Sequence, residues 1–355
     1  MKTTLLATLL LPCALAFTGC SSDTNGGSPN DGGGGGTIDG SVGGGTDGGG
    51  GLSGESFTVT WGPIDVPAGT EDTQCYIARL GNDVDIHVGE ITNILGNSSH
   101  HFIVYRIADG TPSTEPYACQ PFAGTLNPTE GAPLMVTQRA EETLTLPTGV
   151  AFSLKAGQLI RMEMHYLNAT GDTQSVTATS TFKTISDDQF EHEADFLFIG
   201  NPDINLGAGA SSVVTDYLPM PSELMGAKIF GITGHTHQWG TNVTVGLKDG
   251  ENGTPVMLYD VPNFNWDEPD TIMLDPAPVL GANSGFSFTC DFDNQSGNQV
   301  GFGEGVEDEM CFFWAYYYPS KGARVCIHSE QGAQFGLTDL CCPGHALCDT
   351  ILGQL

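Results

Sequence analysis

Short runs of strand-forming residues, separated by glycine, proline and asparagine, occupy most of this chain, and long stretches of helical periodicity are hard to find. Valine, isoleucine, threonine and aromatic side chains suit a pleated sheet, and the residues between the runs favour turns. The runs that we expect to form strands are residues 56–61, 85–91, 101–107, 159–166, 175–181, 227–233, 242–247, 285–291 and 312–318. The pattern predicts an antiparallel all-β protein.

The N-terminal segment has the composition of an export signal followed by a tether. Lys2, an apolar stretch over residues 5–17 and the lipobox-like Thr18-Gly19-Cys20 predict a signal peptide over residues 1–19 and lipidation of Cys20. Because Phe17 stands where such signals usually carry leucine, an ordinary secretory signal cut nearby is the alternative. Residues 20–54, rich in glycine, serine, asparagine and aspartate, predict a flexible tether. We therefore expect an exported protein of the cell envelope or surface, in contact with a membrane only through its lipid anchor.

The net charge of -31 arises from 42 acidic and 11 basic residues. This excess of negative charge argues against nucleic acid and against an anionic membrane surface as partners. It would also repel an anionic reductant at long range. The chain contains no Gly-x-Ser-x-Gly elbow, and the glycine tract of the tether lacks the strand and helix that a phosphate-binding loop or a dinucleotide fingerprint requires.

Eight of the ten cysteines lie beyond the signal and its anchor, because Cys13 belongs to the signal and Cys20 to the lipidation site. An even number of cysteines in an exported chain is typical of a disulfide set. The eight are Cys75, Cys119, Cys290, Cys311, Cys326, Cys341, Cys342 and Cys348.

His235-Thr236-His237 places two imidazoles at positions i and i+2 of a strand-forming run. Alternate strand side chains share a face, so on a regular strand the two would lie about 6.5 Å apart at the backbone and could bind one metal ion. Two half-exposed histidines are the alternative when the motif stands alone. Here it is accompanied by three further segments: His100-His101, Met162-Glu163-Met164-His165 and Asp308-Glu309-Met310-Cys311.

In this order, and with these neighbours, the segments resemble the copper type II, ascorbate-dependent monooxygenases, the family of peptidylglycine α-hydroxylating monooxygenase and dopamine β-monooxygenase. The resemblance extends from about Cys75 to Cys326 and includes Asp72-Thr73-Gln74-Cys75 and Gly303-Glu304-Gly305. It implies two tandem antiparallel β-sandwich (jelly-roll-like) domains, over residues 55–188 and 189–355, with a boundary near residues 186–195. It also implies one copper on each domain, facing across an open cleft.

The resemblance assigns six metal ligands in two sets. His100, His101 and His165 would hold an electron-storing copper, and His235, His237 and Met310 an oxygen-activating one. A thioether suits Cu(I) and is a poor ligand for zinc, calcium or magnesium, so the ligand types favour two copper ions. The alternative for Met310 is a methionine buried in the core that binds no metal. Adjacent residues on a regular strand face opposite ways, so His100 and His101 can share a metal only where the strand is bulged or has ended.

The resemblance also guides the disulfides. It implies the pairs Cys75–Cys119 and Cys290–Cys311. For Cys326 it offers no partner, so Cys341, Cys342 and Cys348 remain open, and we expect a local C-terminal disulfide set.

Three positions matched to the family's substrate contacts are Thr233, Phe312 and Trp314. Thr233 stands where the peptidylglycine enzyme has the arginine that binds a peptide carboxylate. A pocket lined by Phe312 and Trp314 would prefer a small apolar or aromatic molecule, with core packing as the alternative for Trp314. Glu163 shares a strand face with His165, so it is interpreted either as an acceptor for an imidazole or as an exposed glutamate.

Two functions are consistent with the sequence. The first is an exported monooxygenase that hydroxylates an activated C–H bond with O2 and ascorbate or a similar reductant. The second is a copper-binding surface lipoprotein that captures or stores the metal without turnover. The remaining histidines, His87, His192, His328 and His345, match no family ligand, and we interpret them as surface or structural residues.

Overall fold

The structure is a computed structural model that describes residues 54–126, 131–345 and 348. The predicted signal peptide, the lipidation site at Cys20 and nearly all of the predicted tether lie outside the described residues. The fold is all-β, as the sequence predicts, and its helical segments are short: α1 (Ala123–Leu126), η1 (Ser222–Leu224) and η2 (Glu330–Phe335). No helix within the described part of the chain is long and apolar enough to cross a membrane.

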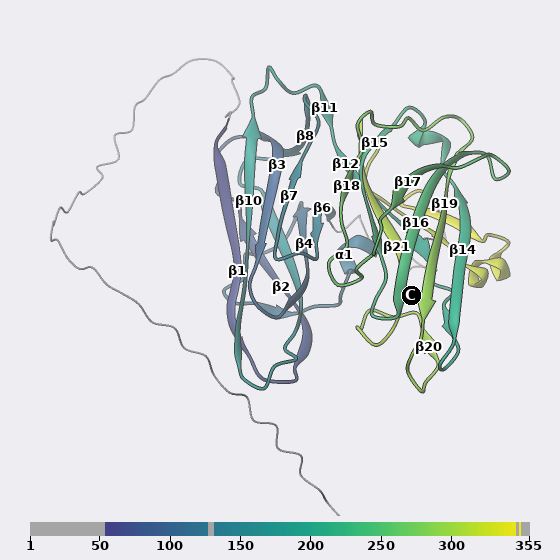
Figure 1. The fold of residues 1–355 in the computed structure, drawn as a ribbon. Helices are drawn as coiled ribbons and strands as arrows, with labels where there is room; N and C mark the ends of the chain where they lie inside the picture. The colour runs from purple at the N-terminus through teal and green to yellow at the C-terminus, as the bar shows by residue number, and fades with distance from the viewer. Residues whose placement is uncertain (1–53, 127–130, 346–347, 349–355) are drawn as a thin grey trace, which may run out of the picture. The chain divides into compact units, whose positions relative to one another are not determined.

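Two sheets are built from the N-terminal half, by which we mean residues 54–194 (Figure 1). One contains β1 (Ser56–Val66), β10 (Gln174–Ile185), β3 (Ile86–Leu95), β8 (Val150–Leu154) and β11 (His192–Glu193) in this order, with β7 (Glu141–Thr145) also paired to β3. The other has the order β5 (Tyr117–Ala118), β2 (Glu71–Arg79), β9 (Leu159–Leu167), β4 (Ser99–Ile107) and β6 (Ala132–Thr137). Trp61 of the first sheet packs on Tyr166 of the second, with ring centroids 6.2 Å apart.

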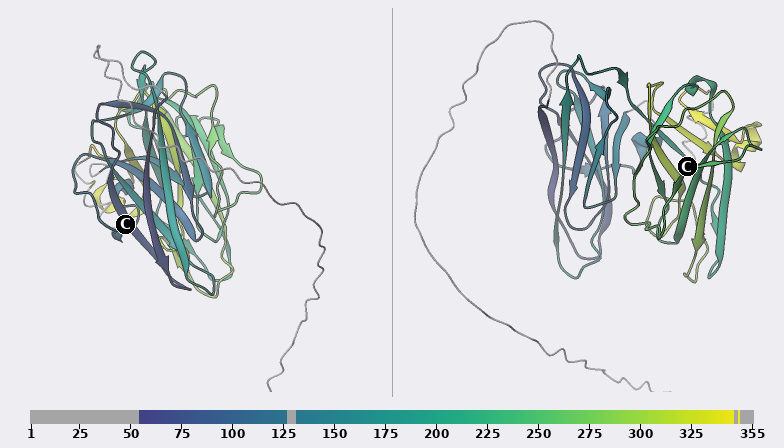
Figure 2. Two further views of the ribbon diagram at one scale, coloured as in Figure 1. Left: turned by 90° about the vertical axis from the view of Figure 1, so that its left-hand side faces the viewer. Right: turned by 45° about the horizontal axis from the view of Figure 1, so that its top comes forward.

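The C-terminal half, residues 195–345, forms a second stacked pair of sheets. Its six-stranded sheet has the order β18 (Ile272–Met273), β15 (Lys228–His235), β21 (Cys311–Tyr318), β12 (Asp195–Asn201), β22 (Arg324–His328) and β23 (Asp339–Cys342). Its four-stranded sheet has the order β14 (Ser211–Pro219), β19 (Ser284–Asp293), β16 (Gly240–Asp249) and β17 (Val256–Asp260), and β13 (Asn205–Leu206) pairs with β20 (Val300–Gly301). Figure 2 shows the strands of these sheets from two further sides.

All nine runs expected from the sequence lie within or overlap observed strands. Two pairs of the strands named above are exceptions to the antiparallel pattern, because β11 pairs with β8, and β12 with β22, in parallel. β11 also carries the sheets of the N-terminal half past residue 188, the predicted end of the first domain. The described residues belong to one compact unit, and the division into two domains stays a prediction.

β21 is buried on both faces, and this explains its continuous apolar sequence. Cys311, Phe313, Ala315 and Tyr317 point into a core formed within the C-terminal half. Phe312, Trp314 and Tyr316 point the other way, into a core shared with β4, β6 and β9. The Tyr316 hydroxyl accepts a hydrogen bond from the Val136 N–H of β6, at 3.3 Å. The six-stranded sheet thus packs directly on the N-terminal half.

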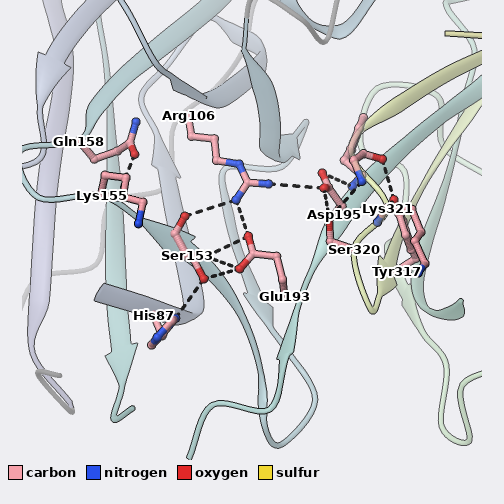
Figure 3. A network of polar contacts seen from close by, with 12 residues as sticks. His87, Arg106, Ser153, Lys155, Gln158, Glu193, Asp195, Tyr317, Ser320 and Lys321 are labelled. Atoms are coloured by element: carbon pink, nitrogen blue, oxygen red, sulfur yellow. Dashed lines mark hydrogen bonds and ion pairs between the residues drawn. The ribbon is translucent and has the colours of Figure 1, made fainter. Parts of the chain in front are cut away.

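Charged groups fix the chain segment that connects the two halves, around residues 193–195 (Figure 3). Arg106, at the end of β4, pairs with Glu193 of β11 and with Asp195, the first residue of β12. The Glu193 carboxylate also accepts the backbone N–H of Ser153 at 3.0 Å, and the Ser153 hydroxyl contacts His87 Nδ1 at 3.1 Å. His87 therefore has a structural environment in this network, where its ring also stacks on Phe190.

Four disulfides join the eight cysteines expected to pair. Cys75–Cys119 and Cys290–Cys311 are present, as the family resemblance implied. Cys326 bonds to Cys341, one of the three partners left open, and Cys342–Cys348 completes the local C-terminal set. Because Cys290 lies on β19 and Cys311 on β21, their bond ties the two stacked sheets of the C-terminal half directly beside Met310.

Removing the Cys290–Cys311 bond by a double alanine substitution should lower the free energy of unfolding by about 3 kcal/mol, because it closes a loop between residues 21 positions apart. The Cys342–Cys348 pair, 6 positions apart, should contribute about 1 kcal/mol less. Denaturant unfolding of both double variants measures the difference. An equal or larger loss of unfolding free energy on removal of the Cys342–Cys348 bond would contradict the structural role of the Cys290–Cys311 bond.

Candidate metal centre

His100, His101 and His165, which we call the first ligand set, come together at one end of β4 and β9. The pairing of these strands shifts register between Ser99 and His101, which is the bulge that the sequence argument required. One ring nitrogen from each histidine lies within 4.8 Å of the others, and all three side chains are buried. The local geometry thus converges three imidazoles on one point.

Hydrogen bonds orient the rings of the first ligand set. His165 Nε2 contacts Glu71 Oε1 at 3.0 Å, and this leaves His165 Nδ1 3.4 Å from His101 Nδ1. His100 Nδ1 contacts Asp267 Oδ1 at 3.1 Å. The Nε2 atoms of His100 and His101 are buried and have no hydrogen-bond partner among the described residues. Because a buried polar atom without a partner costs free energy, nitrogens placed in this way fit metal ligands.

His235, His237 and Met310 form the second ligand set. β15 ends at His235, so His237 lies in the turn before β16 and not on a strand, contrary to the sequence expectation. The two rings are nevertheless close, with centroids 5.2 Å apart at an interplanar angle of 86°. His235 Nδ1 contacts Gln138 Oε1 at 2.9 Å, and its buried Nε2 has no partner within the described part of the chain. His237 Nδ1 contacts the Asp308 carbonyl oxygen at 3.1 Å.

The buried carboxylate of Glu309 holds the second ligand set together. Its Oε2 accepts the backbone N–H groups of His237 at 2.9 Å and Met310 at 3.2 Å, and its Oε1 accepts that of Trp239 at 2.6 Å. Burial raises the pKa of Glu309 to about 7, while these backbone donors oppose the shift. One side chain therefore joins the turn that carries His237 to the segment that carries Met310.

Four imidazoles of the two sets, those of His101, His165, His235 and His237, have lowered pKa values that favour the neutral form. Burial, and then the neighbouring imidazoles, lower the pKa of His101 and of His235 well below the ordinary value. Burial also lowers the pKa of His165, and it lowers that of His237 to about 3. Since only a neutral imidazole has a lone pair free for a metal, the folded chain keeps these ligands ready to bind.

The Phe122 ring lies between the two sets. Its centroid is 4.8 Å from that of His101 and 6.1 Å from that of His235, and it also stacks on Phe198 at 6.0 Å. All six proposed ligands are buried, Met310 included. The expectation of two sites facing across an open cleft is therefore wrong for this structure, because apolar packing between the halves closes the space between them.

Glu163 has neither of the roles expected from the sequence. It is fully buried, and its carboxylate accepts the Phe122 N–H at 2.7 Å and the Tyr105 hydroxyl at 3.1 Å. Burial raises its pKa to about 7, against the opposing effect of the Phe122 N–H. Glu163 thus anchors the loop that places Phe122 between the sets. No sequence pattern pointed to Phe122, because its position depends on this long-range contact.

The three proposed substrate contacts lie close to the second ligand set, within packed surroundings. The Thr233 hydroxyl contacts that of Thr271 at 2.9 Å. Phe312 stacks on Phe198 with centroids 4.9 Å apart, and the Trp314 ring lies 5.8 Å from that of His235. Phe312 and Trp314 are both part of the buried core in this structure.

Residues 211–336 match the family model of the copper type II ascorbate-dependent monooxygenases, C-terminal domain. The matched segment contains the whole second ligand set, and it begins after His165, the last residue of the first ligand set. It supports this family, of copper- and ascorbate-dependent oxidoreductases, for the C-terminal half of the chain.

Several solved structures are distantly similar to this chain. The major capsid protein P2 of bacteriophage PM2 is 12% identical, with 76% of this chain and 100% of that chain covered and a TM-score of 0.34. A chain of the Sulfolobus turreted icosahedral virus is 10% identical, with 85% and 97% covered and a TM-score of 0.33. A putative secreted protein from Eubacterium rectale is 9% identical, with 68% of both chains covered and a TM-score of 0.21. We draw no conclusion from scores this low.

Replacing Glu309 by alanine should lower the free energy of unfolding by about 3 kcal/mol, because three backbone N–H groups, two of them buried, lose their acceptor. The matched control is Glu307→Ala, an exposed glutamate two residues earlier, which should change it by less than about 0.5 kcal/mol. Urea unfolding of the two variants provides the comparison. Similar stabilities would show that Glu309 does not hold this turn.

Proposed function

We propose that this protein is an exported copper-dependent monooxygenase that hydroxylates an activated C–H bond of a small apolar or aromatic substrate, with O2 and a one-electron reductant such as ascorbate. The observation that carries the proposal is the group of buried Nε2 atoms without partners, one on His235 and two in the first ligand set. The family match over residues 211–336 supports the same chemistry. We also propose that a lipid on Cys20 anchors the protein at the cell envelope.

The chemistry of the donor atoms fits two copper ions. Three imidazoles suit either oxidation state of copper, and a set of two imidazoles with a thioether favours Cu(I) and leaves coordination positions open. We assign the first ligand set to electron storage and the second to the reaction with oxygen. Copper, when bound, supplies one-electron chemistry and the reduction of O2.

The chain itself positions and shields these ligands. Each of four histidines has one ring nitrogen in contact with an oxygen atom of the chain, and this contact fixes the direction of its other ring nitrogen. The oxygen atoms belong to Glu71, Asp267, Gln138 and the Asp308 carbonyl. Burial excludes water from both sets and protects reactive species from side reactions. The Phe122 ring separates the two sets with an apolar group.

Apolar surroundings support the proposed substrate class. Thr233 carries no charge and is engaged with Thr271, so no cation at this position would bind a substrate carboxylate. Phe312, Trp314 and Phe198 supply aromatic surface beside His235. Because these rings are packed in the core, a substrate would enter only when the packing between the halves opens.

The second candidate is copper capture or storage without turnover, and the burial of all six proposed ligands favours it. A storage protein needs to hold the metal away from solvent, whereas an oxygenase must also admit O2 and substrate. Both functions predict copper binding, so only turnover distinguishes them.

The purified, folded protein should bind two copper ions. His165→Ala should remove one, and a double alanine substitution at His235 and His237 should remove the other, because the two ligand sets share no residue. His192→Ala, whose ring contacts Tyr318, is the matched control and should retain both ions. Elemental analysis after dialysis measures the number of copper ions per chain in each variant. Full loading in both ligand variants would refute the assignment.

With ascorbate, copper and a panel of small aromatic and aliphatic compounds, the protein should consume O2 and release a hydroxylated product in equal amounts. Labelled O2 should place one oxygen atom in that product. The His235→Ala, His237→Ala double variant should form none. Oxygen consumption without product for every compound in the panel would favour the storage function.

Copper binding to the second ligand set should release almost no protons at pH 5.5. The pKa values of His235 and His237 are lowered far enough that no proton has to leave, whereas two imidazoles of ordinary pKa would release about 1.8 protons. Calorimetric titration of the His165→Ala protein with copper, in two buffers of different ionisation enthalpy, gives the number of protons released. A release near two protons would mean that these rings are solvated in the metal-free protein.

A further inference from the structure

Two proposed ligands are oriented by residues from the opposite half of the chain. His100 lies on β4 of the N-terminal half, and its Nδ1 contacts Asp267 of the C-terminal half at 3.1 Å. His235 lies on β15 of the C-terminal half, and its Nδ1 contacts Gln138 of the N-terminal half at 2.9 Å. In both histidines the remaining Nε2 is buried and has no partner among the described residues. The arrangement is therefore reciprocal.

Gln138 and the segment that carries Asp267 also contact each other. Gln138 uses its carboxamide oxygen for His235 and donates from its Nε2 to the Trp266 carbonyl oxygen at 3.4 Å. The Trp266 ring lies 5.7 Å from that of His100. A carboxamide offers both an acceptor and donors, so this one side chain links a ligand of the second set to the segment that orients a ligand of the first.

Further polar contacts fasten the same two segments. Arg139 forms an ion pair with Asp270, and the Thr271 hydroxyl donates to Glu142 Oε1 at 2.5 Å. The stretch 138–142 of the N-terminal half therefore holds the stretch 266–271 of the C-terminal half at several points. The Asp267 side chain is 58% exposed, whereas His100 beneath it is buried, so Asp267 reaches the ring from the rim of the interface.

We propose that Gln138 and Asp267 are positioning residues that couple the two proposed copper sites, each fixing the tautomer of a histidine in the opposite half. Each accepts the Nδ1 proton and so directs the lone pair of Nε2 towards the metal. The inference rests on the proposed function. Because a copper ion bound to one set would hold in place the ring that these contacts orient, we expect copper at one site to raise the affinity of the other. Linkage makes the factor the same in both directions.

The His165→Ala protein isolates the second site for a test. In this background Gln138→Leu removes the acceptor at similar volume, and the Cu(II) affinity should fall about 10- to 100-fold, with a changed Cu(II) EPR spectrum. Gln138→Glu keeps an acceptor and should stay within about threefold of the parent. The control is Gln158→Leu, a glutamine of the same half that donates to the carbonyl oxygens of Ile107 and Leu159 and should leave affinity and spectrum unchanged.

The reciprocal test uses the His235→Ala, His237→Ala protein, which keeps only the first site. Asp267→Leu should weaken Cu(II) binding there by a similar factor, and Asp267→Asn, which retains an acceptor, should restore most of it. Competition with a chelator of known affinity gives each constant. In the intact protein, Gln138→Leu should abolish the rise in affinity of the second site when the first is filled.

The outcomes separate this inference from the proposed function. If the unmodified protein binds two coppers but Gln138→Leu and Asp267→Leu leave affinities and spectra as in their parents, the coupling is refuted and the copper sites stand. If the unmodified protein binds no copper, the function and the inference fail together. Weakening by Gln158→Leu equal to that by Gln138→Leu would also overturn the coupling, because general destabilisation would then explain both.

Discussion

The burial of both faces of β21 is the constraint on which the rest of the structure depends. Its alternate residues fill the core of the C-terminal half on one side and pack on the N-terminal half on the other. Met310 directly precedes this strand. His235, the last residue of the neighbouring strand β15, pairs with Phe312 of β21. Apolar packing of one strand thus brings ligands from both halves into the same dry region.

Desolvation then determines the chemistry of that region. Imidazoles without water are neutral, and buried carboxylates are stable only where they accept several hydrogen bonds. Glu309 satisfies this condition with backbone N–H groups, and Glu163 does so with the Phe122 N–H and the Tyr105 hydroxyl. These hydrogen bonds fix the turn of His237 and the loop of Phe122. The buried carboxyl groups therefore act as anchors for the loops around the ligands. The ring nitrogens left without partners mark the places where metal ions fit.

The sequence predicted the parts of this structure that depend on local pattern. Strand-forming residues between turn-forming breaks located the nine runs. The opposite directions of adjacent strand residues required the bulge that is observed before His101. β12 was missed because its apolar residues 196–199 follow the polar stretch that we interpreted as a domain boundary. The same-face rule correctly put Glu163 with His165, but it could not reveal that a loop from residue 119 onwards would cover this face.

Contacts between distant segments were the part that no local pattern could supply. Gln138 and Asp267 lie 97 and 167 positions from the histidines that they contact, and neither belongs to a motif. The closed packing was likewise hidden, because the apolar face of β21 has the same sequence whether it meets a substrate or another sheet. Chemical types of ligand are readable from a sequence, whereas the groups that orient them emerge only from the fold.

Anomalous diffraction at the copper edge, from crystals of the copper-loaded protein, tests the central claim most directly. The account predicts two peaks, one against His100, His101 and His165 and one against His235, His237 and Met310, with the Phe122 ring between them. A single peak shared by both sets, or peaks at other residues, would contradict it.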